Sequence, residues 1–100
     1  MRIEKFDTKD EGWQAYGFMV YNRSGYSLPK GMITSFKVEQ FSDMSIEIDF
    51  SVQSPSGDSS DHYNYGMPAI QSFAQGKQIV DMYAQMVEGW ITAESKTESI

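Results

Sequence analysis

The chain has 100 residues, of which 40% are hydrophobic and 14% aromatic, and it contains no cysteine. This composition is too apolar for a disordered chain and predicts one domain with a single modest core. The absence of cysteine excludes a disulfide framework and thiolate chemistry. A formal net charge of −6 repels nucleic acid and attracts basic partners, which favours an acidic binding protein over an enzyme.

The net charge comes from one stretch of the sequence. Between Lys37 and Lys77 there is no lysine or arginine, whereas outside this window the acids and bases cancel. The window contains six acids: Glu39, Asp43, Glu47, Asp49, Asp58 and Asp61. Such a local field steers a basic partner toward this part of the chain and disfavours direct binding of nucleic acid.

The first residues, Met1 to Lys5, include an acid and lack the apolar segment of a signal peptide. No apolar run approaches the roughly 20 residues that span a bilayer. We therefore expect a cytoplasmic protein that does not bind a membrane. The sequence has no P-loop, no Rossmann glycine fingerprint and no zinc-ligand spacing, so we expect no cofactor and no metal.

Residues 9–21 admit two interpretations. Thr8-Lys9-Asp10-Glu11 is a possible capping box for a helix through Tyr21, but Gly12 and Gly17 would each weaken that helix by about 1 kcal/mol. The run from Tyr16 to Tyr21 has the composition of a strand and is bounded by turn-forming residues. We favour the strand, and we expect Tyr26–Gly31 to be a connecting loop.

A hairpin follows. In Met44–Gln53 apolar and polar residues alternate strictly, and Met32–Gln40 alternates more weakly, so we predict two antiparallel strands with one buried face and one wet, acidic face. The apolar residues of the two strands lie on the same face of the hairpin only if the loop between the strands has an odd number of residues. We expect the register that pairs Lys37 with Glu47 and Val38 with Ile46, because the alternative places Glu39 opposite Glu47. The predicted loop is then Phe41-Ser42-Asp43.

The remainder of the chain is predicted to contain a polar loop over Ser54–Tyr65 and one long helix from about Pro68 to Thr92, followed by a polar tail over residues 93–100. The helix has an apolar stripe and a wet side. The stripe is Ile70, Phe73, Ala74, Val80, Tyr83, Ala84, Val87 and Ile91, and the wet side is Gln71, Gln75, Gln78, Asp81, Gln85 and Glu88.

These elements predict an α+β fold, in which a small antiparallel sheet packs against one long C-terminal helix. Residues 1–92 form the domain, with the hairpin over residues 32–53 and a possible N-terminal strand. The predicted contacts join the sheet residues Phe36, Val38, Ile46, Ile48 and Phe50 to the helix residues Phe73, Val80, Tyr83 and Val87.

The candidates for catalysis are weak. His62 lies in the predicted loop beside Asp61, and a triad assembled within one short loop would not hold attack geometry. Glu47 and Asp49 project from one strand face about 7 Å apart, a spacing known from paired-carboxylate hydrolases and hard-cation sites. Such sites need a concave pocket, so a solvated or partner-facing pair is the stronger hypothesis.

Other residues suit a protein interface. Met67, Met82 and Met86, together with Ile79, extend the apolar surface of the helix, either for burial or for docking on a partner. Trp90 lies between the apolar stripe of the helix and this additional methionine surface. Tyr63 and Tyr65 are anchors either for the core or for an interface. An exposed Met67-Pro68 bond is a plausible substrate for a prolyl isomerase.

An acidic, cysteine-free chain of this length, ending in a long helix introduced by Tyr63-Asn64-Tyr65-Gly66-Met67-Pro68, resembles the anti-RecBCD proteins of lambdoid phages. The resemblance implies a phage protein in the cytoplasm of the bacterial host that binds the RecBCD helicase–nuclease. It would alter the Chi-dependent control of that nuclease in favour of phage recombination, without being an enzyme itself. A host prolyl isomerase engaging Met67 and Pro68 fits this picture.

No motif maps the contacts with RecBCD, so the predicted contacts come from chemistry alone. They are Glu47, Asp49, Asp58, Asp61, Tyr63, Tyr65, Met82 and Met86. The alternative function is an acidic DNA mimic or an anti-CRISPR-type inhibitor that occupies a basic channel of another host enzyme. Such mimics carry denser runs of acids than this chain.

Overall fold

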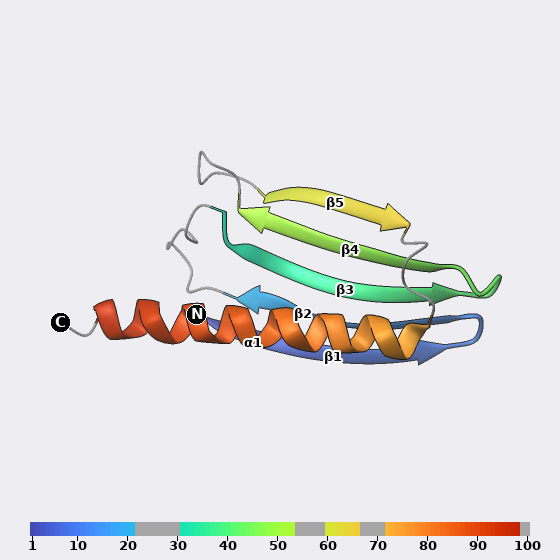
Figure 1. Ribbon diagram of the computed structural model, residues 1–100, viewed down its shortest axis with the longest axis horizontal. Helices are drawn as coiled ribbons and strands as arrows, with labels where there is room; N and C mark the ends of the chain where they lie inside the picture. The colour runs from blue at the N-terminus through green and yellow to red at the C-terminus, as the bar shows by residue number, and fades with distance from the viewer. Residues whose placement is uncertain (22–30, 54–59, 67–71, 99–100) are drawn as a thin grey trace.

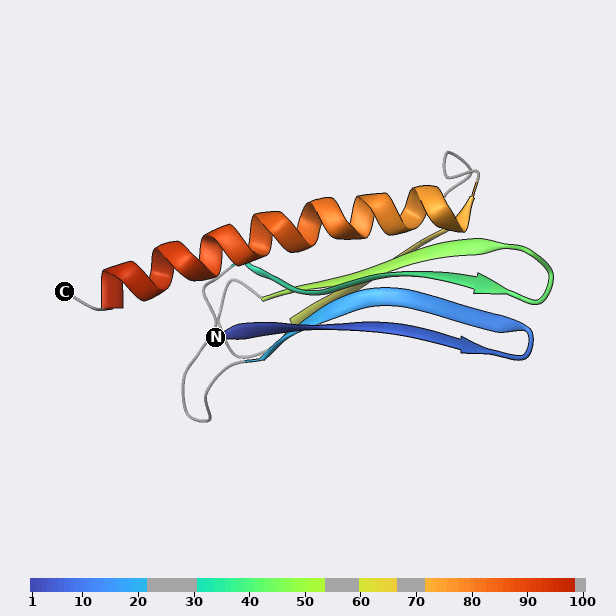
Figure 2. The same ribbon diagram turned by 90° about the horizontal axis from the view of Figure 1, so that it is seen from below.

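The computed structural model describes residues 1–21, 31–53, 60–66 and 72–98 (Figure 1). Its elements are β1 (Arg2–Asp10), β2 (Trp13–Tyr21), β3 (Ile33–Phe41), β4 (Ile46–Gln53), β5 (Ser60–Gly66) and α1 (Phe73–Glu98). The strands form one antiparallel sheet in sequence order, and α1 lies along one face of it (Figure 2). The predicted α+β fold is confirmed.

The N-terminal third is a hairpin of two strands. Asp10 pairs with Trp13 across a two-residue turn, and Gly12 has a φ of 74°, a left-handed conformation that glycine adopts without a steric penalty. The strand interpretation of Tyr16–Tyr21 is therefore correct and the capping-box helix is wrong. Strand β1 was not predicted, because its residues alternate too weakly in hydropathy.

The register predicted for the second hairpin is wrong by two residues. In the structure Val38 pairs with Ile48 and Lys37 with Asp49, while Glu39 lies opposite Glu47. The prediction considered only residues directly opposite each other on the two strands. In the structure the Lys37 Nζ lies 3.2 Å from Glu39 Oε1, on its own strand, and 4.0 Å from Asp49 Oδ2, on the neighbouring strand. One ammonium thus compensates two carboxylates, and the Glu39–Glu47 pairing is tolerated.

The turn between β3 and β4 also sets this register. It is closed by hydrogen bonds from the Phe41 N–H to the Ser45 carbonyl (3.0 Å) and from the Met44 N–H to the Phe41 carbonyl (2.9 Å). Met44 has a φ of 69°, and Asp43 Oδ1 accepts hydrogen bonds from the Ser45 N–H and hydroxyl. The loop is Ser42–Met44, which confirms the odd number of residues but shifts the predicted loop by one.

Strand β5 corrects the prediction of a loop over Ser54–Tyr65. Residues 54–59 lie outside the described residues, but Ser60–Gly66 forms the last strand of the sheet and pairs along β4. An end strand needs backbone pairing on one side only and tolerates polar side chains. His62 therefore lies in a strand and not in a mobile loop.

The helix begins and ends later than predicted. Ser72 is its N-cap: its Oγ accepts a hydrogen bond from the Gln75 N–H at 3.1 Å, and its carbonyl accepts one from the Gly76 N–H at 3.2 Å. Pro68, which lies outside the described residues, is therefore upstream of α1 and not in its first turn. The helix continues to Glu98, so the predicted polar tail is helical over residues 93–98.

The core lies between α1 and the face of the sheet that it covers, and the helix packs mainly on β3 and β2. Val38, Ile48 and Val80 are buried as predicted, and the Tyr83 ring stacks on Phe36 with centroids 4.5 Å apart. Helix and sheet approach closely at Gly76, where a Cβ would lie 2.5 Å from Val38 Cγ2. The fully or largely buried apolar cluster is Phe18, Met32, Phe36, Val38, Ile48, Val80, Ala84 and Val87.

Candidate functional site

A cluster of polar side chains lies on the sheet face opposite α1. Because Phe36 and Val38 face the helix, the alternation of β3 directs Lys37 and Glu39 to the other face. There the Trp13 Nε1–H donates a hydrogen bond of 2.8 Å to Glu39 Oε2, and Lys37 bridges Glu39 and Asp49. We call Trp13, Lys37, Glu39 and Asp49 the polar cluster.

The polar cluster overturns the prediction of a wet, acidic face. Glu39 is 8% exposed and Asp49 is 5% exposed, and Glu47 on the same face is half-buried. Burial raises the pKa of Glu39, but hydrogen bonds with Asp49, Trp13 and Lys37 outweigh it and hold that pKa below its usual value. The Lys37 ammonium offsets part of the negative charge of Glu39 and Asp49, so the cluster contributes less to the acidic field than its two acids suggest.

Two cavities border this face. One of about 170 Å³ adjoins the polar cluster, and one of about 260 Å³ lies at the end of the sheet, between the β1–β2 and β3–β4 turns. The larger is lined by Trp13, Phe41 and Met44, and Met44 is 70% exposed at its rim. Among the described residues no group of three or more His, Cys, Asp or Glu is placed to hold a metal ion.

Five of the predicted contact residues lie on the neighbouring strands β4 and β5. Glu47 and Asp49 belong to β4, and Asp61, Tyr63 and Tyr65 belong to β5. The register pairs Asp61 with Val52, Tyr63 with Phe50 and Tyr65 with Ile48. The five residues therefore lie on adjacent strands at one end of the sheet, but the β4 positions that pair with Asp61, Tyr63 and Tyr65 alternate with Glu47 and Asp49 and belong to the other face of the sheet. We call β4 and β5 together the acidic edge.

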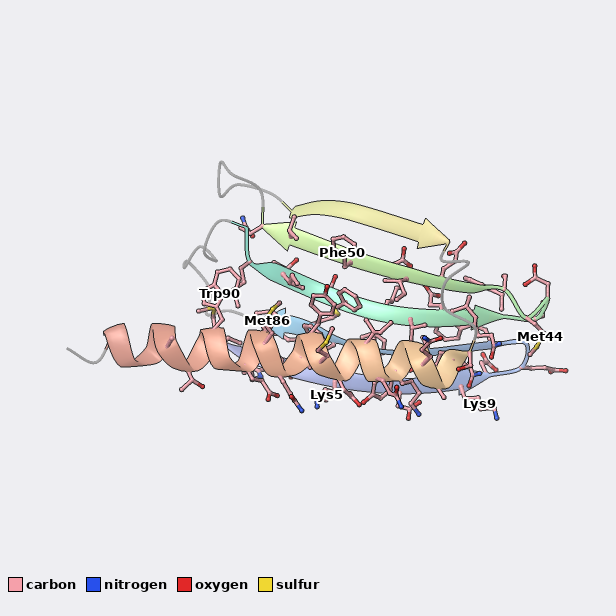
Figure 3. The ribbon with its side chains drawn as sticks, in the orientation of Figure 1. Lys5, Lys9, Met44, Phe50, Met86 and Trp90 are labelled. Atoms are coloured by element: carbon pink, nitrogen blue, oxygen red, sulfur yellow. The ribbon has the colours of Figure 1, made fainter. Side chains whose placement is uncertain are left out.

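The strands of the sheet differ in charge. The acidic edge contains Glu47, Asp49 and Asp61 but no lysine or arginine, whereas in β1 the bases Arg2, Lys5 and Lys9 are balanced by three acids. Figure 3 shows Lys5 and Lys9 on the side of α1 away from Phe50. Asp58 lies outside the described residues, as do Met67 and Pro68, so the contact with a prolyl isomerase stays a prediction.

Met82 and Met86 lie apart from the acidic edge, on the outer surface of α1. They are 58% and 50% exposed, which excludes the interpretation that these two side chains are core. Asp81, by contrast, accepts a hydrogen bond from the Tyr16 hydroxyl, which raises the pKa of Tyr16 to about 12. A residue predicted on the wet side of the helix therefore anchors α1 to β2.

Neither the polar cluster nor the larger cavity, between the β1–β2 and β3–β4 turns, was predicted from the sequence. The signal for the cluster was the single base Lys37 beside Glu39 at the border of the acidic window, together with the uneven alternation of β3. The larger cavity could not be predicted from the sequence, because Trp13 and Phe41, which line it, become neighbours only when β2 pairs with β3.

Comparisons with known proteins identify no relative: no family model matches the sequence, and no curated protein or solved structure matches it either. Within the described part of the chain, α1 is too polar to be a membrane-spanning helix.

Proposed function

We propose that this protein is a non-enzymatic inhibitor or modulator of a host enzyme, and that it binds a basic surface of its target through the acidic edge. The observation that carries this proposal is the composition of β4 and β5, which contain acids but no lysine or arginine. A local excess of negative charge accelerates association with a partner of opposite sign.

The position of β5 supports the same proposal. It is the last strand in the sheet order, and no other described strand pairs with its outer side, which is the position that a partner strand can occupy. Tyr63 and Tyr65 lie on this strand, and tyrosine is enriched among the residues that dominate binding energy at interfaces. Charge on the edge then governs the rate of encounter, and aromatic contacts hold the complex.

The target that the sequence suggests is the RecBCD helicase–nuclease, through the resemblance to the anti-RecBCD proteins of lambdoid phages. Binding would alter the response of the nuclease to Chi and so favour phage recombination. A DNA mimic is the weaker candidate, because a mimic needs its acids exposed. Here Glu39 and Asp49 are buried and share Lys37.

The test measures binding to purified RecBCD and nuclease activity on linear duplex DNA with and without Chi. We expect Asp61→Lys to slow association about tenfold at low ionic strength. The matched control is Glu11→Lys, the same charge change at an exposed position of the β1–β2 turn, which should leave the rate nearly unchanged.

Two results would contradict the proposal separately. Equal slowing by both substitutions would show that net charge matters and the acidic edge does not. If RecBCD neither binds the wild-type protein nor changes its response to Chi, the target is wrong, whatever the edge does.

A further inference from the structure

The outer surface of α1 carries an exposed stripe that the proposed function does not use. Met82, Met86, Gly89 and Ala93 are all exposed, and they follow one another at intervals of four, three and four residues. This is the spacing of the seam of a coiled coil, in which one helix packs against another. Figure 3 shows Met86 and Trp90 on the same stretch of the helix. We call these four residues the seam.

Among the described residues, no contact requires a glycine at position 89. Glycine inside a helix is destabilising relative to alanine, and the other glycine of α1, Gly76, is required because a Cβ would collide with Val38. At Gly89 a Cβ would meet nothing within 4 Å. A small residue at this position leaves room for another helix to approach α1 closely.

We propose that the seam pairs with the seam of a second copy of this chain, with the two helices antiparallel around a two-fold axis. In this register Met86 of each copy lies over Gly89 of the other, and Met82 lies over Ala93. Each large side chain therefore meets a small one, as packing without voids requires. A two-fold axis makes both halves of the contact identical.

Charge on the helix is compatible with this partner. Beside the stretch from Met82 to Ala93, the exposed positions Gln78, Gln85 and Thr92 are uncharged, and the first ionised residue beyond them on this side is Lys96. Asp81 and Lys77 are turned toward Tyr16 on β2: Asp81 is hydrogen-bonded to its hydroxyl, and the Lys77 Nζ lies 5.0 Å from its ring centroid. Two molecules that each carry a net charge of −6 therefore meet on a neutral strip, where repulsion between like charges is smallest.

The size of the seam sets the strength of the contact. From Met82 to Ala93 the helix rises about 16 Å, so the pair falls in the class of small interfaces, below about 1,200 Å². We expect a dimer that dissociates in the micromolar range or above. Both acidic edges stay accessible, so this inference is independent of the proposed target.

The test is sedimentation equilibrium of the full chain over a range from micromolar to millimolar concentration. We expect dimer formation by the wild type and at least a tenfold weaker dimer for Gly89→Gln, whose side chain fills the space that Met86 needs. Ala74→Gln introduces the same side chain at an exposed position of the first turn of α1, outside the paired stretch from Met82 to Ala93, and should dimerise like the wild type. Thermal melting of each variant at low concentration confirms that it is folded.

Cross-linking tests the direction of the helices, without background because the chain has no cysteine. A mixture of Met82→Cys and Ala93→Cys should oxidise to a mixed disulfide. Each variant alone should not, because like positions are about 16 Å apart along an antiparallel pair. A monomer at every concentration, undiminished pairing of Gly89→Gln, or disulfides between like variants would each overturn the proposal.

Discussion

At the scale of single residues, the polar cluster is the feature that most shapes the properties of the protein. Two carboxylates are buried on the open face of the sheet, and burial of such groups is unfavourable unless each has a partner. Lys37 and Trp13 supply those partners. Lys37 therefore acts as a structural counter-ion, and a charge reversal at Asp49 would disturb the fold as well as the surface.

The lowered pKa of Glu39 predicts a specific acid sensitivity. A folded pKa below the unfolded value of 4.5 contributes stability that is present above pH 4.5 and is lost as the pH falls through the folded pKa. Glu39→Gln keeps the shape of the side chain and its capacity for hydrogen bonding. We expect the free energy of unfolding of this variant, measured in urea, to fall less between pH 6 and pH 2 than that of the wild type. Glu11→Gln, at an exposed turn, is the control. If the free energy of unfolding of Glu39→Gln fell with pH as steeply as that of the wild type, the role of this carboxylate would be contradicted.

At the scale of elements, the docking of α1 on the sheet depends on close approach as well as on apolar area. The helix meets β3 at Gly76, and the stacked rings of Tyr83 and Phe36 continue the contact. On its other flank, the hydrogen bond from Tyr16 to Asp81 fixes the rotation of the helix about its axis. Apolar burial holds α1 to the sheet, and these contacts decide its distance and orientation.

The two glycines of α1 allow a matched comparison. Alanine is a better helix former than glycine by about 1 kcal/mol, so Gly89→Ala should raise the free energy of unfolding by about 0.5–1 kcal/mol when measured at low concentration. Gly76→Ala forces a Cβ to within 2.5 Å of Val38 and should lower it by about 1–3 kcal/mol. Urea unfolding measures both, and stabilisation by Gly76→Ala would refute the packing account.

At the scale of the whole molecule, the important property is the separation of two surfaces. The acidic edge lies at one end of the sheet, and the seam lies on the outer side of the helix, which packs on β3, β2 and β1 (Figure 1). One surface is governed by charge and the other by apolar contact. A dimer built on the seam would present two acidic edges to its targets.

This separation predicts opposite responses to salt. Salt screens the attraction between the acidic edge and a basic target, so association with the target should slow as ionic strength rises. The same screening reduces the repulsion between two copies that each carry −6, so the dimer should tighten. Stopped-flow binding and sedimentation at low and high salt measure the two effects. Parallel changes in both would show that one surface serves both contacts.

The sequence by itself determined the local features of this protein. Strict alternation predicted β4, and apolar spacing of 3.6 residues predicted α1, because each pattern reports how one element exposes its own side chains. The parity of the β3–β4 loop was also predictable, since a slip of one residue would turn every side chain to the wrong face. The acidic window was visible as composition alone.

Only the tertiary structure decided the features that depend on neighbours distant in sequence. The register of β3 on β4 follows from Lys37 serving two acids at once and from the turn at Asp43, which pairwise counting of charges did not weigh. Burial of Glu39 and Asp49 depends on which strands lie beside β3 and β4. Strand β5 forms because its backbone pairs with that of β4. Alternation tells which residues share a face of the sheet, but only the assembled sheet determines what covers that face.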